Sequence, residues 1–188
     1  DKVAPQLHLP VQSGSSRVLK AMNRHYDRET YLDEVRRLKE LIPDIVLTSD
    51  IIVGFPGETE EEFEETLSLL EEVRFDSLFT FIFSPRVGTP AAKMDDPVPM
   101  TEKKKWFQRL LDTQNRISVE KHKEYIGRIL PVLVEEENPA DEVNNLNCRT
   151  DGWRLVHVPG DVSLLGQRKK VKITDCSTWS LFGEFVEE

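Results

Sequence analysis

Three short runs of mostly apolar residues alternate with helical patterns in the first half of the chain. The runs are Leu7–Gln12, Ile45–Val53 and Leu78–Ser84, and the second is apolar at nearly every position. Strands that are buried on both faces have this pattern, and they occur in parallel sheets. Amphipathic helical patterns cover Arg28–Ile42 and the residues after Thr59. This alternation predicts right-handed crossovers in an α/β fold with a parallel sheet or barrel.

The start of the second helix has the clearest local signal. Thr59 with Glu62 three residues later matches a capping box, and the acidic first turn suits the positive end of the helix dipole. The stretch between Ser84 and Met100 is rich in proline, which predicts a loop. A further helix is predicted from Thr101 to about Lys123, as a connecting helix.

The pattern changes after Gly127. Short alternating runs follow, separated by turn residues, and they are typical of strands in a small all-β barrel of the OB type. We therefore place a domain boundary near Tyr125. The predicted strands are Leu130–Glu135, Arg154–Val158, Arg168–Thr174 and Leu181–Val186.

Composition excludes few classes of protein. The 188 residues are 38% hydrophobic and 31% charged, which is ordinary for a globular protein. No apolar run approaches the roughly 20 residues that span a bilayer. The net charge of −9 counts against nucleic-acid binding by bulk charge, so only a local basic cluster could contact RNA. Cys148 and Cys176 lie far apart, which favours two reduced thiols in a cytoplasmic protein. The start of the chain, without Met, indicates a piece of something longer.

Polar residues stand at the predicted strand ends, where parallel folds place their ligands. Gln12 can donate and accept, which suits a ribose hydroxyl, although Ser caps of a simple turn explain the same segment. Asp50 lies within an apolar strand, so it is either hydrogen-bonded structurally or faces a ligand. Gly54 and Gly57 permit close approach of the backbone to a ligand.

The third run, FTFIFSPRVGTP, joins an aromatic strand to a stiff Pro/Gly loop. Read alone, its phenylalanines Phe79, Phe81 and Phe83 are expected in the core.

In this order, HLPVQSGS, AMNRHY, SDIIVGFPGETEEEFEET and FDSLFTFIFSPRVGTPAA resemble the radical-SAM methylthiotransferases. That family includes MiaB-type tRNA enzymes and RimO-type ribosomal-protein enzymes. RTDGWR and LFGE near the end of the chain resemble its TRAM domain. The resemblance implies a partial (βα) radical-SAM, TIM-like barrel followed by a small all-β, OB-like TRAM domain. Residues 1–95 would be the C-terminal half of the barrel, 96–125 a linker and connecting helix, and 126–188 the TRAM domain.

The resemblance also implies cofactors. The family binds S-adenosylmethionine and two 4Fe–4S clusters, one of them through a CxxxCxxC motif that is not in this sequence. This chain would therefore hold neither cluster, carry no catalytic or metal-binding residue, and be inactive alone. By analogy with related enzymes, Gln12 and Asp50 would contact the ribose, and Arg24 the methionine carboxylate. The loop with Gly54, Gly57 and Glu58 would pass close to the adenine.

The substrate implied by the resemblance is tRNA. RTDGWR is more similar to the tRNA-modifying branch, and the full enzyme would add a methylthio group to carbon 2 of isopentenyladenosine beside the anticodon. The alternatives are threonylcarbamoyladenosine tRNA, a ribosomal protein, or a non-catalytic RNA-binding module. Residues expected to contact the anticodon stem-loop are Arg149, Trp153, Arg154, Arg168, Lys169, Lys170 and Lys172. The alternative for them is a mixed solvated surface, because residues 126–188 hold 7 Lys or Arg against 11 Asp or Glu.

Three further expectations concern single features. His25 and Cys148 stand where the family more often has glycine. His8 is expected to be structural, and the alternative is that it faces a cluster. The open edge of an incomplete barrel is expected to make the chain self-associate or marginally stable.

Overall fold

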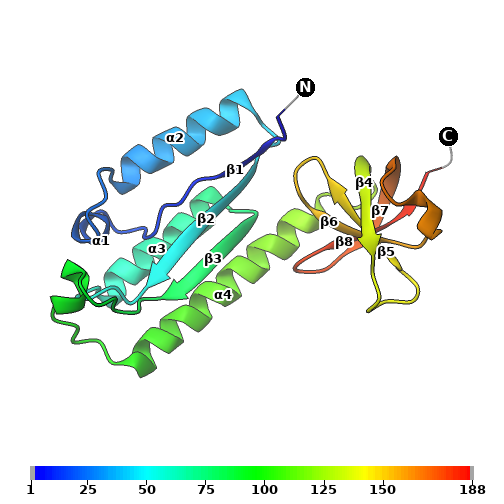
Figure 1. The fold of residues 1–188 in the computed structure, drawn as a ribbon. Coiled ribbons are helices and arrows are strands. Elements are labelled where there is room, and N and C mark those ends of the chain that lie inside the picture. The colour runs from blue at the N-terminus through cyan, green and yellow to red at the C-terminus, as the bar shows by residue number, and fades with distance from the viewer. Residues whose placement is uncertain (1–2, 187–188) are drawn as a thin grey trace. The chain divides into compact units, whose positions relative to one another are not determined.

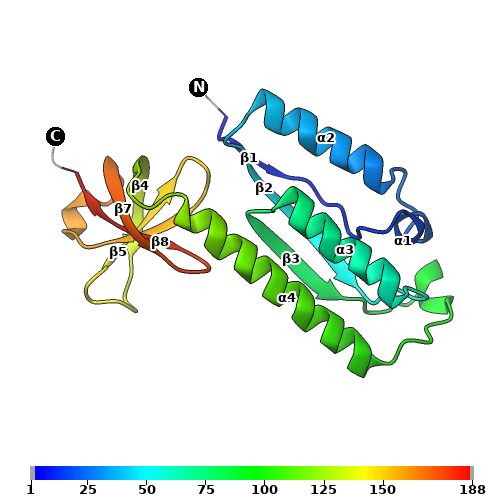
Figure 2. The ribbon, with the colours of Figure 1, turned by 180° about the vertical axis from the view of Figure 1, so that it is seen from behind.

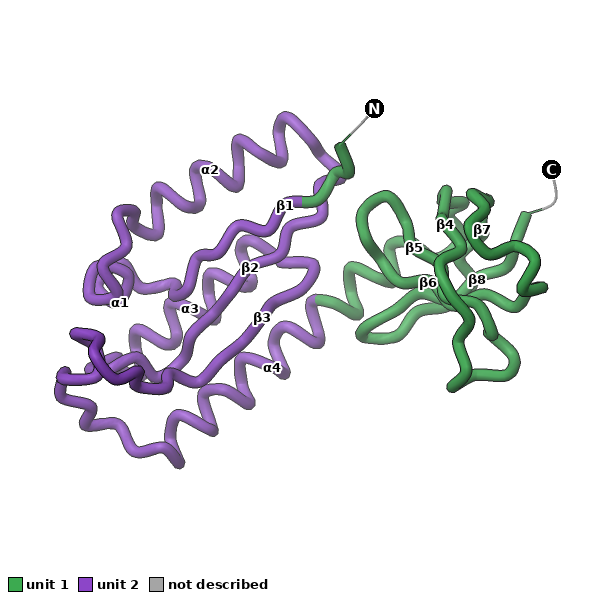
Figure 3. The backbone as a smooth tube through the Cα atoms, viewed as in Figure 1, with its two compact units in different colours: residues 1–6, 118–188 green, residues 7–117 purple. Residues whose placement is uncertain are grey.

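The computed structural model describes residues 3–186 and divides into two compact units (Figures 1 and 3). The sheet unit comprises residues 7–117, and the barrel unit comprises residues 1–6 with 118–188. The predicted fold class, a parallel α/β sheet followed by a small β-barrel, is confirmed. Every helix within residues 3–186 is too short or too polar to cross a lipid bilayer.

The sheet unit contains three strands in the order β1-β2-β3. They are Gln6–His8, Val46–Val53 and Ser77–Ile82, and β3 runs parallel to β2. The first strand is shorter than the predicted Leu7–Gln12, because Pro10 has no N–H and Gln12 adopts a φ of 78°. Only an isolated bridge joins Gln12 to Ile51 beyond it.

Helices cover one face of this sheet (Figures 1 and 2). Alternate β2 residues Leu47, Ile51 and Val53 are buried in a core shared with α2, α3 and α4. The β2 residues of the opposite parity point away from those helices and form a second face of the sheet. Phe79 and Phe81 of β3 pair with two of these residues, Asp50 and Ile52, and are 58% and 54% exposed. The expectation that these two rings are core residues is therefore wrong. The helices are α1 Ser16–Ala21, α2 Arg28–Leu41, α3 Glu60–Val73 and α4 Met100–Lys123.

The start of α3 confirms the predicted capping box. The Thr59 side chain accepts a hydrogen bond from the Glu62 N–H, and the Glu62 carboxylate accepts one from the Thr59 N–H. The proline-rich stretch is a loop as predicted, interrupted by a 3-10 turn at Pro90–Lys93.

The barrel unit is a closed barrel in the strand order β4-β5-β6-β8-β7. Closure pairs every strand on both sides, so the unit has no free strand edge. Its core is formed by small and branched side chains that alternate along the strands, such as Val132, Val134 and Val171. The second strand, β5, was not predicted from the sequence. The strands are β4 Ile129–Glu137, β5 Leu146–Thr150, β6 Leu155–Val158, β7 Arg168–Cys176 and β8 Leu181–Phe185, with a 3-10 turn at Val162–Leu164 between β6 and β7.

Candidate functional site

Gln12 and Asp50 meet beside the bridge that joins their segments. The Gln12 N–H donates to the Asp50 carbonyl at 2.9 Å, and Gln12 Nε2 lies 3.5 Å from Asp50 Oδ2. His8 adds a second contact, with Nε2 at 3.4 Å from Asp50 Oδ1 and Nδ1 at 2.9 Å from Thr48 Oγ1. The structure thus brings together two residues that the sequence singled out, and the Asp50 carboxylate has partners on both sides.

A pocket of about 340 Å³ lies at the C-terminal ends of β2 and β3. Arg24 contributes its only cation, and the walls are mostly apolar. Neither Gln12 nor Asp50 is among the residues that line it, but Ile52, two residues beyond Asp50, is. The pocket is therefore bounded by the end of α1, the C-terminal ends of the strands and the proline-rich loop. Its principal lining residues are Arg24, Ile52, Phe55, Phe83, Pro90 and Met94.

Glu58 holds the loop that follows β2. Its carboxylate accepts hydrogen bonds from the Gly54 N–H at 2.5 Å and the Phe55 N–H at 3.2 Å, and the residue is 2% exposed. The carboxylate thus faces the loop's own amides. Burial raises the pKa of Glu58 to about 7, although the two amide hydrogen bonds oppose that shift.

Gly54 is required by a close approach from within the protein. A Cβ at this position would lie 2.5 Å from Cδ of Lys103, and the φ of +73° also disfavours other residues. Lys103 is 2% exposed, and its Nζ donates to the Gly54 carbonyl at 2.8 Å and to Asp96 at 2.5 Å. Sequence reasoning missed Lys103, since three consecutive lysines at 103–105 are typical of a solvated helix face.

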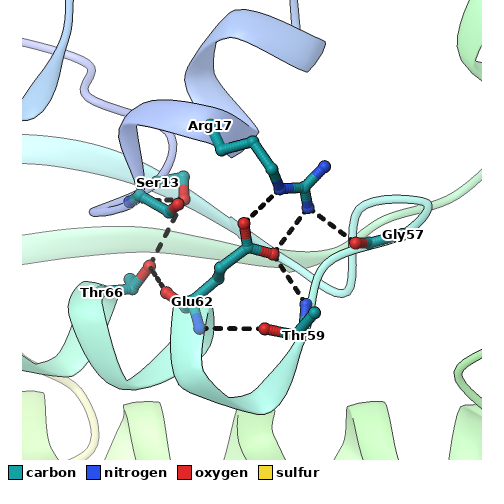
Figure 4. Close-up of polar contacts among 7 residues, drawn as sticks. Ser13, Arg17, Gly57, Thr59, Glu62 and Thr66 are labelled. Atoms are coloured by element: carbon teal, nitrogen blue, oxygen red, sulfur yellow. Dashed lines mark hydrogen bonds and ion pairs between the residues drawn. The ribbon is translucent and has the colours of Figure 1, made fainter.

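A second network ties the turn after Gln12 to α3 (Figure 4). The Arg17 guanidinium donates to the Gly57 carbonyl at 2.6 Å and to both carboxylate oxygens of Glu62. The Gly14 N–H donates to Thr66 Oγ1 at 2.9 Å. The two segments that the sequence named as candidate cofactor loops are therefore joined directly.

The buried Glu58 carboxyl makes a prediction about pH. Because its folded pKa lies near 7 and its ordinary value near 4.5, the protonated form is favoured by folding. The stabilisation is complete below about pH 4.5 and is lost as pH rises through about 7. We expect wild type to lose roughly 2–4 kcal/mol of unfolding free energy between pH 5 and pH 8 from this group, at 1.36 kcal/mol per pKa unit.

Urea unfolding followed by helical circular dichroism at both pH values measures this loss. Glu58→Gln should remove it, whereas the control Glu61→Gln, at an exposed neighbour, should retain it. An equal pH dependence in wild type and Glu58→Gln would show that Glu58 does not titrate as described.

Basic residues line the outer face of the barrel unit on β7 and β5. Arg168, Lys170 and Lys172 alternate with inward residues of β7 and are exposed. On β4, Leu133 lies between Arg168 of β7 and Arg149 of β5. Directly paired residues of neighbouring strands point to the same side, so these side chains share one surface, which we call the basic face.

An aromatic ring flanks the basic face. Trp153 is 60% exposed, and the Arg149 guanidinium stacks over it at 5.4 Å from the ring centroid. Arg149 also pairs with Glu135 at 3.0 Å, and Arg168 with Asp151 at 3.2 Å. The basic charge is therefore partly neutralised, and the exposed indole is available for stacking.

Two of the predicted RNA-contact residues lie elsewhere. Arg154 is 8% exposed, with its guanidinium 4.6 Å from the centre of the Tyr125 ring. Lys169 is half-buried and has the inward parity of Val171. Burial argues against phosphate contacts by Arg154, and the orientation of Lys169 makes it the weaker candidate on β7.

The thiols give no sign of a metal centre. Cys148 is buried, Cys176 is half-buried, and both are free thiols. Burial raises the pKa of Cys148 to about 11, which disfavours the thiolate that binds metals. Within residues 3–186, no three His, Cys, Asp or Glu side chains lie close enough together to hold a metal ion.

Comparison with known proteins places these features in a family. Residues 2–70 match the radical SAM superfamily and residues 123–186 match the TRAM domain. The chain is 55% identical, over 99% of its length, to tRNA-2-methylthio-N(6)-dimethylallyladenosine synthase of Clostridium botulinum strain Hall, and covers 41% of that protein. The proteins of the same name from Acetivibrio thermocellus and Bacillus cereus strain B4264 are 52% and 57% identical over 99% and 97% of the chain, which covers 38% and 36% of them.

The chain thus spans about two-fifths or less of the length of these relatives. Both domain matches fall where the sheet unit and the barrel unit lie. The chain therefore belongs to the radical-SAM methylthiotransferase family, of which it carries a radical-SAM segment and a TRAM domain.

Proposed function

We propose that this chain is part of an enzyme that adds a methylthio group to carbon 2 of dimethylallyladenosine, the isopentenyladenosine beside the anticodon of tRNA. The sheet unit would bind S-adenosylmethionine and the barrel unit would bind the RNA. The observation that carries the proposal is the identity of more than half of the residues, across both units, to relatives named for this product. No observation favours threonylcarbamoyladenosine, a ribosomal protein or a non-catalytic module.

The residues of the sheet unit fit S-adenosylmethionine. The pocket offers apolar and aromatic walls for an adenine, with Phe55 and Phe83 among them, and a cation, Arg24, for a carboxylate. Gln12 and Asp50 supply donors and acceptors of the kind that bind ribose hydroxyls. Bound there, S-adenosylmethionine would be the source of the radical when an electron from outside this chain cleaves it, and a second molecule would be the source of the methyl group. The protein residues would bind the cofactor, orient it and exclude water from the apolar walls.

The described residues do not fit an iron–sulfur cluster. Such clusters are held by several thiolates, whereas Cys148 is buried in the barrel core and Cys176 lies at the end of β7. We expect iron analysis of the isolated chain after anaerobic reconstitution to find no stoichiometric iron.

The barrel unit supports RNA binding through a local patch. The basic face places Arg149, Arg168, Lys170 and Lys172 on one surface despite the net charge of −9. The exposed Trp153 suits stacking of an unpaired base, which is how proteins read single-stranded loops. An anticodon loop is a substrate of this kind.

Nucleoside analysis of cellular tRNA tests the proposed function. A strain that lacks the gene from which this chain derives should accumulate dimethylallyladenosine and lose its methylthio derivative. The full-length gene should restore the derivative, and the gene with Arg24→Ala should not. Normal methylthio content in the deletion strain would refute the proposal, whereas loss of a methylthiolated threonylcarbamoyladenosine would redirect it to that substrate.

A further inference from the structure

Arg17 contacts both the loop after β2 and the first turn of α3. Its Nη2 donates to the Gly57 carbonyl at 2.6 Å and to Glu62 Oε2 at 2.6 Å, while its Nε donates to Glu62 Oε1 (Figure 4). Arg17 lies in α1, which begins four residues after Gln12. One side chain thus connects the turn that carries Gln12 to the loop that carries Gly54 and Phe55.

The geometry needs a guanidinium. A planar fork can contact two carboxylate oxygens and a carbonyl at once, whereas an ammonium has no fixed fork to match them. Glu62 is already committed to the capping box, because its Oε2 also accepts from the Thr59 N–H at 2.9 Å. Arg17 and Glu62 are therefore held together: hydrogen bonding by Arg17 keeps the pKa of Glu62 below its usual range.

The two ends of the loop are held by different residues. At Gly54, the N–H donates to the Glu58 carboxylate and the carbonyl accepts from Lys103 Nζ. At Gly57 the backbone has a φ of +73°, and no atom other than those of Gly57 and its two chain neighbours lies within 4 Å of the position that a Cβ would occupy. Packing therefore does little to hold Gly57, and the hydrogen bond from Arg17 to its carbonyl is the contact that joins it to α1.

We propose that Arg17 is a positioning residue for the cofactor site. It fixes the Gly57 end of the loop against the turn that carries Gln12, so that Phe55 and Gln12 keep their relative places before the cofactor arrives. Arg17 is not itself among the residues that line the pocket. This inference rests on the proposed function, since it assumes that the pocket binds S-adenosylmethionine.

The test compares Arg17→Gln and Arg17→Lys with a matched control, Arg116→Gln, in the whole chain. Arg116 also pairs with a glutamate of α3, Glu71, and is about half exposed like Arg17, but Glu71 lies at the opposite end of α3 from Thr59. Calorimetry with S-adenosylmethionine should show binding weakened about fivefold to tenfold in Arg17→Gln, as for loss of a partly exposed charged hydrogen bond. Arg17→Lys should recover part of that loss, and Arg116→Gln should bind like wild type.

Thermal unfolding and amide hydrogen exchange separate positioning from general stability. Arg17→Gln should lower the melting temperature somewhat more than Arg116→Gln, because the Glu62 side chain is 11% exposed whereas that of Glu71 is 48% exposed. Exchange of the Glu58 and Thr59 amides should quicken only in Arg17→Gln. Unchanged cofactor affinity and unchanged exchange in Arg17→Gln would overturn the inference.

The two proposals can fail separately. If wild type binds S-adenosylmethionine and Arg17→Gln binds it equally well, the positioning role is wrong and the cofactor site stands. If wild type itself fails to bind, the cofactor proposal fails for this chain. The role of Arg17 in holding the loop is then decided by the exchange of Glu58 and Thr59, where rates equal to those of Arg116→Gln refute it.

Discussion

Replacing Arg168, Lys170 and Lys172 together by glutamate should weaken tRNA binding by about 100-fold or more at moderate salt, because three phosphate-facing cations become repulsive. The three side chains alternate along β7 and are all exposed on the basic face. The slope of log affinity against log salt should also fall by about one for each lost contact. A filter-binding assay with the anticodon stem-loop, repeated over a series of salt concentrations, measures both effects.

The control for this variant must change net charge equally. Arg37, Lys104 and Lys105 are exposed on α2 and α4 in the sheet unit, and their replacement by glutamate should leave binding and its salt slope close to wild type. Equal losses of tRNA affinity in both triple variants would show that the net charge of the chain, and not the basic face, determines binding. If the β7 variant binds tRNA as tightly as wild type does, the basic face is only a solvated surface.

Arg24→Ala should weaken S-adenosylmethionine binding by roughly 2–3 kcal/mol, about 30-fold to 150-fold, the usual cost of losing a hydrogen bond to a charged group. Arg24 is exposed at the rim of the pocket, and no carboxylate pairs with its guanidinium within residues 3–186. Its charge is therefore available for a ligand carboxylate. Isothermal titration of the cofactor into the chain measures the change.

Asp50→Asn serves as the companion variant and Arg37→Ala as the control. Asp50→Asn should also weaken binding, since the neutral amide keeps one acceptor but loses the charge that His8 and Gln12 contact. Arg37→Ala should bind like wild type. Unchanged affinity in both Arg24→Ala and Asp50→Asn would refute the assignment of the pocket.

Local signals in the sequence were enough to predict much of the fold. The capping box at Thr59 fixed the start of α3 to the residue, because its two hydrogen bonds involve neighbours in the chain. The boundaries of β2 and α2 were likewise predicted within one residue. Strand β5 was missed because its sequence, LNCRT, is short, follows two asparagines and has only Leu146 and Cys148 as apolar residues at its inward positions. Only closure of the barrel around it explains why it is a strand.

Residue roles that depend on tertiary contacts were harder to predict. Arg154 looked like a phosphate ligand among other basic residues, but it precedes β6, is 8% exposed and lies with its guanidinium over the Tyr125 ring. Phe79 and Phe81 looked like core residues, but lie exposed on β3. The meeting of Gln12 with Asp50, by contrast, agrees with the family resemblance, which implied that both residues would contact the same ribose.

Natural variation at positions 54 and 103 should be correlated among homologous sequences. The Lys103 stem occupies the space that a side chain at position 54 would need, and its Nζ binds the Gly54 carbonyl. An alanine at 54 alone would meet this stem, while a short residue at 103 alone would leave the carbonyl and Asp96 without their donor. A side chain at position 54 should therefore occur mainly in lineages that already carry a shorter residue at 103.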